Sequence, residues 1–525
     1  MISSRGAVLG ALAAVAALSI HSATVRSQGA GSAANGSDDD EGSNGSGTGS
    51  GSALVAPSDP SIRLGWLRGQ IEGAITLRPT LAKARIAVAV SELATGQELI
   101  ARQSDQKMNL ASNAKLLTGI AALAGLGGGF RWRTAVYVET EPDETGTVTG
   151  DLHVRGRGDP VLLPGDLKQL AHDVAARGIR NVEGKLVIDG GYFDSVTEPP
   201  HFDEQPKERA AFRAPIASFA VARGAFTVTV MPDPGGAASV TLEPAAGEYL
   251  QLTKQEVTSI AVGRTRLRVD TKPKRGNLEI EVIGQIRAGE GSWDIRRRVD
   301  DPTRFAAEVF KRALADAGVQ IRKKAIAQGP VPLTAKLVAV HDSPTLAEAV
   351  RIMNKHSDNN VAESILKTLG AELKGTPGPA SWADAQKVQQ AQLSRFGLLP
   401  GSYRTANGSG LYASTEVTAK QLVTVLAAAH KDYRIGPDLV ASLPTGGYDG
   451  TLARRWHGKP AKGRVRAKTG TLDKVTTLAG YLAVDGGRVL VFAILVNDIP
   501  PGQRNIVRAM ADDMVDSLAA YLGAS

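Results

Sequence analysis

Apolar residues recur along much of this chain at intervals of three and four, the spacing that predicts amphipathic helices. The pattern is clear at Leu64–Ile75, Ala111–Leu126, Leu346–Asn354 and Asn360–Leu369. A stretch of the same kind closes the chain, with apolar residues at Ile506, Val507, Met510, Met514, Leu518 and Tyr521. We therefore expect helices at the start of the folded part and again towards its end.

Between residues 131 and 344 the apolar positions instead form short runs with strand character. Turn residues separate the runs, which is typical of a β-rich module. The runs lie at 134–140, 150–156, 184–190, 225–231, 266–271 and 278–284. Two helical segments, Leu167–Arg177 and Pro302–Ala317, interrupt them.

Strand patterns also occur outside this central region. Ala87–Glu92 is one, and the apolar runs Leu478–Val484 and Val489–Val496 are separated by Asp485-Gly486-Gly487, a strong hairpin signal. Because helical patterns precede and follow these strands, we predict an α+β fold in which helices surround an antiparallel sheet.

The two patterns divide the chain into parts. We assign residues 61–130 and 345–525 to the α+β domain, and residues 131–344 to a long β-rich insertion that forms one or two extra domains. A chain of 525 residues is long enough for this division, at roughly 100–200 residues per domain.

The N-terminus has the pattern of an export signal. Residues 1–23 combine a positive Arg5, the apolar run Ala7–Ile20 and a small-residue cleavage site at His21-Ser22-Ala23. The run is short for a transmembrane helix of about 20 residues, and an uncleaved membrane anchor is the alternative. Residues 24–60 are rich in Gly and Ser and predict a disordered linker.

Composition narrows the function classes further. The formal net charge is +8, but Lys and Arg are scattered rather than clustered, so we do not expect nucleic-acid binding. The chain contains no Cys and therefore no disulfide. We expect an exported protein of the periplasm or cell envelope, and the sequence leaves its oligomeric state open.

Three short motifs follow one another along the chain: Ser112-Asn113-Ala114-Lys115, Ser357-Asp358-Asn359 and Lys468-Thr469-Gly470-Thr471. Each motif is weak evidence alone. Together and in this order they are the signature of active-site serine enzymes that act on D-alanyl peptides or β-lactams.

The first motif can hold a nucleophile and its base. A serine hydroxyl needs an adjacent base, and positions i and i+3 share a helix face, so Lys115 can reach Ser112. The N-terminus of the helix stabilises developing negative charge. Lys115 can act as the base only when neutral, a form that burial and a nearby cation such as Lys468 favour.

The second motif has two interpretations. Ser, Asp and Asn favour turns and helix caps, so an isolated motif of this kind is a turn or a cap. In the functional interpretation Ser357 passes a proton to the leaving amine, and Asn359 binds Lys115 and the substrate.

The third motif can bind the substrate along a strand. Lys468 and the hydroxyl of Thr469 can meet a substrate carboxylate, and Gly470 lets the substrate approach the backbone closely. The N–H groups of Thr471 and Ser112 can form an oxyanion hole, which is usually the largest catalytic contribution.

Two other segments share the Ser-x-x-Lys pattern, at Ser104–Lys107 and Ser364–Lys367. The first lies in a polar stretch before the helix, and the second lies inside a helix. Ser112 alone opens directly into a long apolar helix, so we predict Ser112 as the nucleophile.

With these motifs the chain resembles the class C low-molecular-mass penicillin-binding proteins, the D-alanyl-D-alanine carboxypeptidase/endopeptidases of peptidase family S13. The resemblance covers roughly residues 64–522, and the long insertion after the first motif is part of it. It also rests on five further segments: Gly156–Pro160, Ala214–Ser218, Ser357–Glu363, Asn407–Leu411 and Gly447–Leu452.

The resemblance implies a reaction on peptidoglycan stem peptides. Ser112 would attack the carbonyl between the last two D-alanines, D-alanine would leave, and water would hydrolyse the acyl-enzyme. Related enzymes also cut the D-Ala–diaminopimelate cross-link. β-Lactam antibiotics would acylate Ser112 as covalent inhibitors, and no metal or other cofactor is implied.

The chain departs from the family pattern at one segment. The family usually has Asp where this chain has Asn407, and Ser-Arg where it has Tyr412-Ala413. The missing arginine is associated with the diamino-acid side chain of the stem. We assign the pocket for that side chain to Asp203, Leu411 and Tyr412.

Two rival functions remain. A serine β-lactamase shares the nucleophile but normally lacks the long insertion, and it would turn penicillin over rapidly. A non-catalytic cell-wall-binding protein of the same fold would form no penicilloyl adduct and release no D-alanine. The intact motifs favour the peptidase.

Overall fold

The computed structural model describes residues 54–525, apart from residues 234, 485–486 and 524–525. The predicted signal peptide and most of the predicted linker lie outside the described residues. The described residues of the linker contact the folded part: Ala56 is buried, and the Arg63 side chain donates to the Pro57 carbonyl at 2.9 Å. Among the described residues, no helix is both long and apolar enough to cross a membrane.

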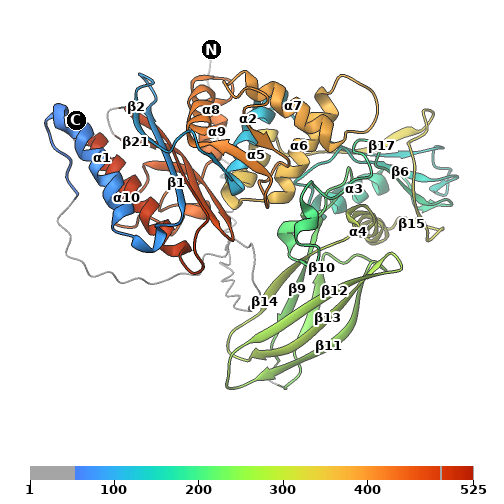
Figure 1. The fold of residues 1–525 in the computed structure, drawn as a ribbon. Coiled ribbons are helices and arrows are strands. Elements are labelled where there is room, and N and C mark those ends of the chain that lie inside the picture. Colours follow the sequence, from blue (N-terminus) through green and yellow to red (C-terminus); the bar gives the residue numbers. More distant parts are fainter. Residues whose placement is uncertain (1–53, 234, 485–486, 524–525) are drawn as a thin grey trace, which may run out of the picture.

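A five-stranded antiparallel sheet forms the centre of one part of the molecule (Figure 1), with the strand order β2-β1-β22-β21-β20. Its N-terminal strands pair with strands from the far end of the chain, so the two predicted halves meet in this sheet. β20 stands at one edge. The bounds are β1 (Arg85–Glu92), β2 (Glu98–Arg102), β20 (Val465–Leu472), β21 (Val475–Ala483) and β22 (Val489–Asn497).

Both faces of the sheet are covered by helices because its central strands are apolar on both sides. Alternate side chains of a strand point to opposite faces, and β1 shows this directly. Ile86, Val88 and Val90 belong to the core under α1 and α10, whereas Ala87 and Ala89 belong to the core under the other helices. The bounds of the first pair are α1 (Pro60–Thr76) and α10 (Arg504–Gly523).

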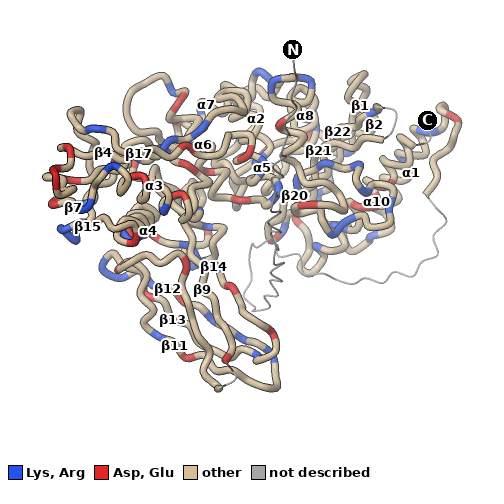
Figure 2. Tube along the Cα trace, turned by 180° about the vertical axis from the view of Figure 1, so that it is seen from behind, with Lys and Arg blue, Asp and Glu red and all other residues tan. Residues whose placement is uncertain are grey.

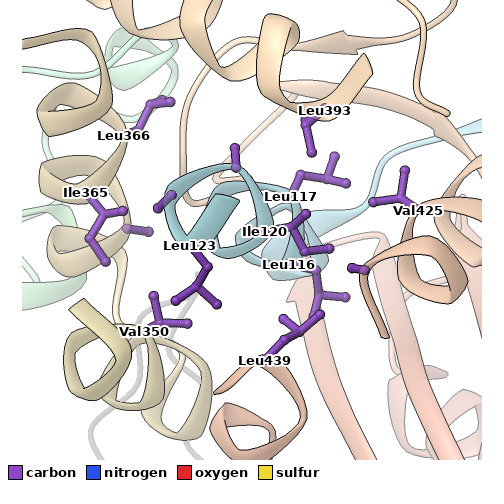
Figure 3. Packing of buried hydrophobic residues seen from close by; sticks show 14 of the residues in the cluster. Leu116, Leu117, Ile120, Leu123, Val350, Ile365, Leu366, Leu393, Val425 and Leu439 are labelled. Atoms are coloured by element: carbon purple, nitrogen blue, oxygen red, sulfur yellow. The ribbon is translucent and has the colours of Figure 1, made fainter. Parts of the chain in front are cut away.

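The second helical layer surrounds the helix that follows Ser112, which is α2. Leu116, Leu117, Ile120 and Leu123 of α2 point outward in several directions and meet apolar side chains of the neighbouring helices (Figure 3). A helix that is apolar all round is stable only when it is buried. The layer consists of α2 (Ala114–Leu126), α5 (Leu346–His356), α6 (Asn359–Leu373), α7 (Trp382–Ser394), α8 (Ala419–Lys431) and α9 (Gly436–Ser442).

The chain leaves this part at β4 and returns at β17, and the segment between them forms a second part with its own core. One sheet, in the order β16-β8-β6-β4-β17, carries α3 (Pro164–Ala176) and α4 (Pro302–Asp316). Its strands are β4 (Arg133–Val138), β6 (Leu152–Arg155), β8 (Leu186–Asp189), β16 (Ile326–Gln328) and β17 (Lys336–Asp342). A small sheet beside it contains β5 (Thr147–Val148), β7 (Asn181–Val182) and β15 (Gln320–Ile321).

Two three-stranded sheets project from this second part (Figure 1), in the orders β10-β9-β14 and β11-β13-β12. Their buried residues and those of α3 and α4 belong to one cluster, so a single core joins the projection to its base. The strands are β9 (Ala225–Met231), β10 (Ser239–Glu243), β11 (Leu250–Ile260), β12 (Arg266–Lys274), β13 (Asn277–Arg287) and β14 (Trp293–Arg298).

Charged residues are spread over both parts of the molecule. Figure 2 shows Lys and Arg interspersed with Asp and Glu along the whole described trace. This distribution agrees with the scattered pattern in the sequence.

Candidate active site

Ser112 lies just before the N-terminus of the buried helix α2. It belongs to a short 3-10 turn, Ala111–Asn113, which leads directly into α2 at Ala114. The sequence predicted one continuous helix from Ala111, but Ala111 has a left-handed φ of 45°, so the regular helix begins later. Ser112 itself is half-buried, which leaves its hydroxyl at the surface of the core.

Lys115 is fully buried and holds the three segments of the site together. Its Nζ donates to Ser112 Oγ at 3.0 Å, to Asn359 Oδ1 at 2.6 Å and to the Ser409 carbonyl at 3.0 Å. An ammonium group has three protons, and these three acceptors lie on three different segments. The structure therefore brings the first two motifs into direct contact.

Ser357 and Asn359 stand at a tight junction between two helices. Ser357 ends α5 in the left-handed conformation, with φ 56°, and Asp358 caps α6 by accepting from the Val361 N–H at 3.1 Å. Asn359 is the first residue of α6, and its Nδ2 donates to the Phe212 carbonyl at 3.0 Å. The second motif is thus both a helix cap and part of the cluster around Lys115.

The third motif lies on the edge strand β20. Lys468 is fully buried, and its Nζ donates to Ser357 Oγ at 2.8 Å and to the Thr469 carbonyl at 2.7 Å. Thr469 Oγ1 binds Thr451 Oγ1 at 2.8 Å, which ties the strand to the predicted 447–452 segment. Lys468 therefore joins the third motif to the second.

Gly470 lets this strand pass close to the nucleophile. A Cβ atom at Gly470 would lie 3.0 Å from the Ser112 backbone nitrogen and 2.8 Å from the Leu110 carbonyl oxygen. Only glycine fits so close a passage without displacing one of the two backbones. The next residue, Thr471, is half-buried in the same strand.

The two rival Ser-x-x-Lys segments do not form such a cluster. Ser104 is buried while Lys107 is exposed on β3 (Lys107–Met108). Lys367 donates to Asp194 Oδ1 at 2.5 Å and to the Val196 carbonyl at 2.8 Å, both in the inserted part. Neither lysine contacts the serine three residues before it in any bond recorded for the described residues.

The sequence did not single out Glu363, although it ends the SDNNVAE segment. Its carboxylate accepts from the N–H of Gly408 at 2.8 Å and from the N–H of Ser409 at 2.9 Å. Burial raises the pKa of Glu363, while the hydrogen bonds from Ser409 and Gly408 and the charge of Lys115 oppose this rise. The only sequence signal was its position four residues after Asn359, on the same face of one helix.

The proposed side-chain pocket is assembled only in part. The η3 turn, Phe202–Glu204, does lie against the Tyr412 segment: Tyr412 Oη donates to Gln205 Oε1 at 3.2 Å, and the Ala413 N–H donates to Glu204 Oε2 at 3.4 Å. Asp203 itself is exposed.

The two residues of the pocket that follow Gly410 are less exposed. Leu411 is half-buried, and its carbonyl accepts from Asn407 Nδ2 at 3.2 Å. Tyr412 is 9% exposed, and its ring faces the guanidinium of Arg213 at 5.3 Å. Burial raises the pKa of Tyr412 to about 12, so its hydroxyl stays protonated at neutral pH.

Within the part of the chain that the structure describes, one group of side chains could hold a metal ion, and it is in the inserted part. Glu139, Asp151 and His153 have ligand atoms within 4.8 Å of one another. His153 Nε2 already binds Glu139 Oε1 at 2.9 Å, and Asp151 Oδ1 accepts from the Lys185 N–H at 2.7 Å. These bonds account for the grouping, and none of the three residues belongs to the site around Ser112.

The fold and the site define a class of protein: an active-site serine hydrolase built on a helix–sheet–helix domain with a large insertion. A family model for the D-Ala-D-Ala carboxypeptidase 3 (S13) family matches residues 67–520, and the chain belongs to this family. The family, the α+β fold class and the serine-type hydrolase predicted from the motifs are therefore confirmed.

Individual relatives agree with this assignment. The chain is 35% identical over 476 residues to a D-alanyl-D-alanine carboxypeptidase of Actinomadura sp. strain R39, covering 88% of this chain and 86% of that protein. Among solved structures, penicillin-binding protein 4 of Haemophilus influenzae has a similar fold, with a TM-score of 0.70 at 24% identity, covering 85% of this chain and 98% of that one. That protein has also been solved in complex with a β-lactam.

Proposed function

We propose that this protein removes the terminal D-alanine from peptidoglycan stem peptides through an acyl-enzyme on Ser112, and that β-lactams acylate the same serine. The observation that carries the proposal is a set of hydrogen bonds between segments far apart in sequence. Lys115 binds both Ser112 and Asn359, and Lys468 binds Ser357. Curated relatives named as D-alanyl-D-alanine carboxypeptidases support the substrate class.

The first chemical step transfers the Ser112 proton and forms the acyl bond. With Lys115 in its neutral amine form, Ser112 Oγ attacks the carbonyl between the two D-alanines, and its proton passes to Lys115 Nζ, which lies 3.0 Å away. The oxyanion binds the N–H groups of Ser112 and Thr471, the strand neighbour of Gly470.

The second step expels the amine and frees the enzyme. The bond to the leaving D-alanine breaks, and the proton that Lys115 took from Ser112 passes through the Ser357 hydroxyl to the leaving amine, so that Lys115 is neutral again. Lys468 Nζ donates to the Ser357 hydroxyl at 2.8 Å. Water then attacks the acyl carbonyl, Lys115 takes its proton, and Ser112 Oγ leaves with a proton returned to it. The same steps on a D-Ala–diaminopimelate bond give endopeptidase activity.

Substrate binding follows from the outer edge of β20 after Ala467, since the edge before it is occupied: the Ala467 N–H donates to the Pro444 carbonyl at 3.1 Å, and the Gly446 N–H donates to the Val465 carbonyl at 3.0 Å. An edge strand presents unpaired backbone N–H and C=O groups that can pair with an extended peptide. We propose that the stem peptide lies along β20, and that the hydroxyls of Thr469 and Thr471 bind its terminal carboxylate together with Lys468. We also propose that the protein works outside the cytoplasm, as its predicted export signal and its family suggest.

Replacing the nucleophile tests this function. Ser112→Ala should abolish labelling by a fluorescent penicillin and D-alanine release from a D-Ala-D-Ala peptide, with the melting temperature little changed. Ser104→Ala and Ser364→Ala are matched controls and should label like the parent protein. Labelling that persists in Ser112→Ala, or peptide mapping that finds the adduct on Ser104 or Ser364, contradicts the assignment.

The same assay separates the rival functions. A penicilloyl adduct that decays within seconds, with penicillin consumed in large excess over enzyme, indicates a β-lactamase. No adduct and no released D-alanine in the parent protein indicates a non-catalytic role. A long-lived adduct together with D-alanine release supports the peptidase.

A further inference from the structure

Glu363 is a completely buried carboxylate that none of the catalytic steps uses. It lies on α6 one turn after Asn359, so both side chains point from the same helix face towards α2. Its exposed fraction is 2%, and its neighbour Lys115 is fully buried. Burying a charged group is costly unless hydrogen bonds or an opposite charge stabilise it, so a role for this carboxylate should be found in its contacts.

Glu363 binds two successive backbone N–H groups of the 407–411 segment. Both of its oxygens accept backbone N–H groups, Oε2 from Gly408 at 2.8 Å and Oε1 from Ser409 at 2.9 Å. The Ser409 side chain adds a third hydrogen bond to the carboxylate. A carboxylate with three donors is fixed in position, and it fixes the peptide that it binds.

The carbonyl groups of the same two residues point the other way, towards α2. The Gly408 carbonyl accepts from Thr118 Oγ1 at 2.8 Å, and the Ser409 carbonyl accepts from Lys115 Nζ at 3.0 Å. Thr118 and Lys115 lie one turn apart on α2, and Ser112 precedes Lys115 by the same interval. The Gly408–Ser409 segment is therefore clamped between Glu363 on one side and the catalytic face of α2 on the other.

The Gly408–Ser409 segment is packed too tightly to shift between these two sides. A Cβ atom at Gly408 would lie 2.7 Å from the Ala362 carbonyl oxygen. Ser409 is 1% exposed. The Ser409 carbonyl is one of three acceptors that define where Lys115 Nζ sits, so a displaced peptide would move the amine away from Ser112 Oγ.

The charges around Glu363 are those of the site itself. Lys115 faces it from α2, and Lys468 on β20 lies behind Ser357. The carboxylate of Asp358, the residue before Asn359, pairs with Arg223 at 3.1 Å. Among the described residues, Glu363 is therefore a buried negative charge that interacts with the charge of Lys115.

We propose that Glu363 is a positioning residue of the active site, which fixes the Gly408–Ser409 peptide under Lys115 and balances the charge of the Lys115 ammonium. The inference rests on the proposed function of Lys115 as the base. It has two consequences. The carboxylate sets the distance from Lys115 to Ser112. Its negative charge also favours protonated Lys115, so a higher pH is needed to form the neutral base.

The pH dependence of acylation separates these consequences from simple structural support. In Glu363→Gln the negative charge is gone, the cationic form of Lys115 is less favoured, and the neutral base appears at lower pH. The acid limb of the rate constant for acylation by penicillin should therefore move to lower pH by about one unit or more. The plateau should fall about ten- to a hundredfold, because one N–H loses its acceptor and Lys115 is displaced.

Two further variants identify the cause. Glu363→Asp keeps the charge but is too short to reach both N–H groups, so its plateau should fall while its acid limb stays in place. Thr118→Val removes the other anchor of the same peptide without changing any charge, and it should also lower only the plateau. Glu308→Gln, a buried glutamate of α4 in the inserted part, is the matched control and should acylate like the parent protein.

The outcomes are distinct. An acid limb that stays in place in Glu363→Gln overturns the proposal, and so does an equal shift of the limb in Thr118→Val. If Glu363→Gln does not fold, Glu363→Asp decides, since an unchanged plateau there overturns the positioning role. Failure of the parent protein and Glu308→Gln to form an adduct would instead contradict the proposed function.

Discussion

At the scale of single residues, the side-chain amide of Asn407 matches the donors and acceptors around it. The side chain is 2% exposed. Its Oδ1 accepts from the Gly410 N–H at 2.9 Å, and its Nδ2 donates to the carbonyls of Pro200 and Leu411 at 3.1 and 3.2 Å. An aspartate, the residue usual in the family, would present an oxygen to both carbonyls, so the amide is the group that fits here.

The variant Asn407→Asp should therefore be less stable than the parent protein. The carboxylate would lose both donated hydrogen bonds and face two carbonyl oxygens, at a cost of about 1–3 kcal/mol. These surroundings raise the carboxyl pKa in the folded state, so the loss should be smallest below pH 4 and should grow as the pH rises. Urea unfolding at pH 4 and pH 7 measures this, and equal losses at both values would contradict the argument.

The sequence predicts the residues proposed for the chemistry but not the residues that position them. Ser112, Lys115, Ser357 and Lys468 could be predicted because their motifs have a fixed spacing and order. Glu363 has no such motif of its own, since its role depends on a peptide some 45 residues away that only the fold brings to it. Side chains that position others through the backbone leave almost no pattern in one sequence.

At the scale of elements, α5 is tied to the loop before β20 by one ion pair. Lys355 Nζ binds Asp449 Oδ1 at 2.7 Å and Oδ2 at 2.6 Å, and Asp449 Oδ1 accepts from the Thr445 N–H at 2.7 Å. Burial lowers the pKa of Lys355, and the bond to Asp449 opposes this. The pair holds the helix that ends at Ser357 against the loop that leads to Lys468.

Asp449→Asn should loosen this connection. Burial opposes ionisation of Asp449, but the bonds from Lys355 and Thr445 outweigh it and hold its pKa below the usual 3.8. The ionised group thus adds stability above that value, and the contribution is lost as the pH falls through the lowered pKa. The variant should lose about 1 kcal/mol or less at pH 7, since the carboxylate is partly exposed and screened by water, and the difference should shrink towards pH 3 in thermal unfolding.

Elements were predictable where their own pattern was clear. The apolar strands β1, β21 and β22 and the helices α2, α4 and α5 follow from periodicity. The strands β11 and β14 did not, because LQLTKQEVTSI and WDIRRR alternate weakly and carry many polar residues. They are strands because the neighbouring β13 and β9 pair with them along their length. A local sequence pattern cannot predict this pairing.

At the scale of the whole molecule, the inserted part is sensitive to pH near the point where it returns to the catalytic part. Asp159 is buried, and burial raises its pKa to about 7; the Val161 N–H opposes this rise, and the Asp166 charge adds to it. Its Oδ2 lies 3.7 Å from His341 Nε2 on β17, the strand that leads back out of the insertion. The folded chain therefore keeps a proton here that the unfolded chain loses above about pH 4.

It follows that stability contributed by neutral Asp159 is present below pH 4 and is lost as the pH rises to about 7. Asp159→Asn removes this titration, and its amide can donate to His341. The variant should be more stable than the parent protein at pH 8 by about 2–4 kcal/mol, and the gain should disappear towards pH 4. Chemical unfolding at these two pH values tests this, and a variant that is less stable at pH 8 would refute it.

The pairing of β1 with β22 also fixes the order in which this enzyme can be completed. Arg85 lies opposite Asn497 and Glu92 lies opposite Leu490, so the middle of the sheet joins the two extremes of the chain. Ser112 and Lys115 are synthesised before the strand that β1 needs, and Lys468, which precedes that strand, follows Lys115 by more than 350 positions. Such distant pairing is slow to form. The protein therefore remains without hydrolytic activity while it is synthesised, and it becomes a hydrolase only when its final strands close the sheet.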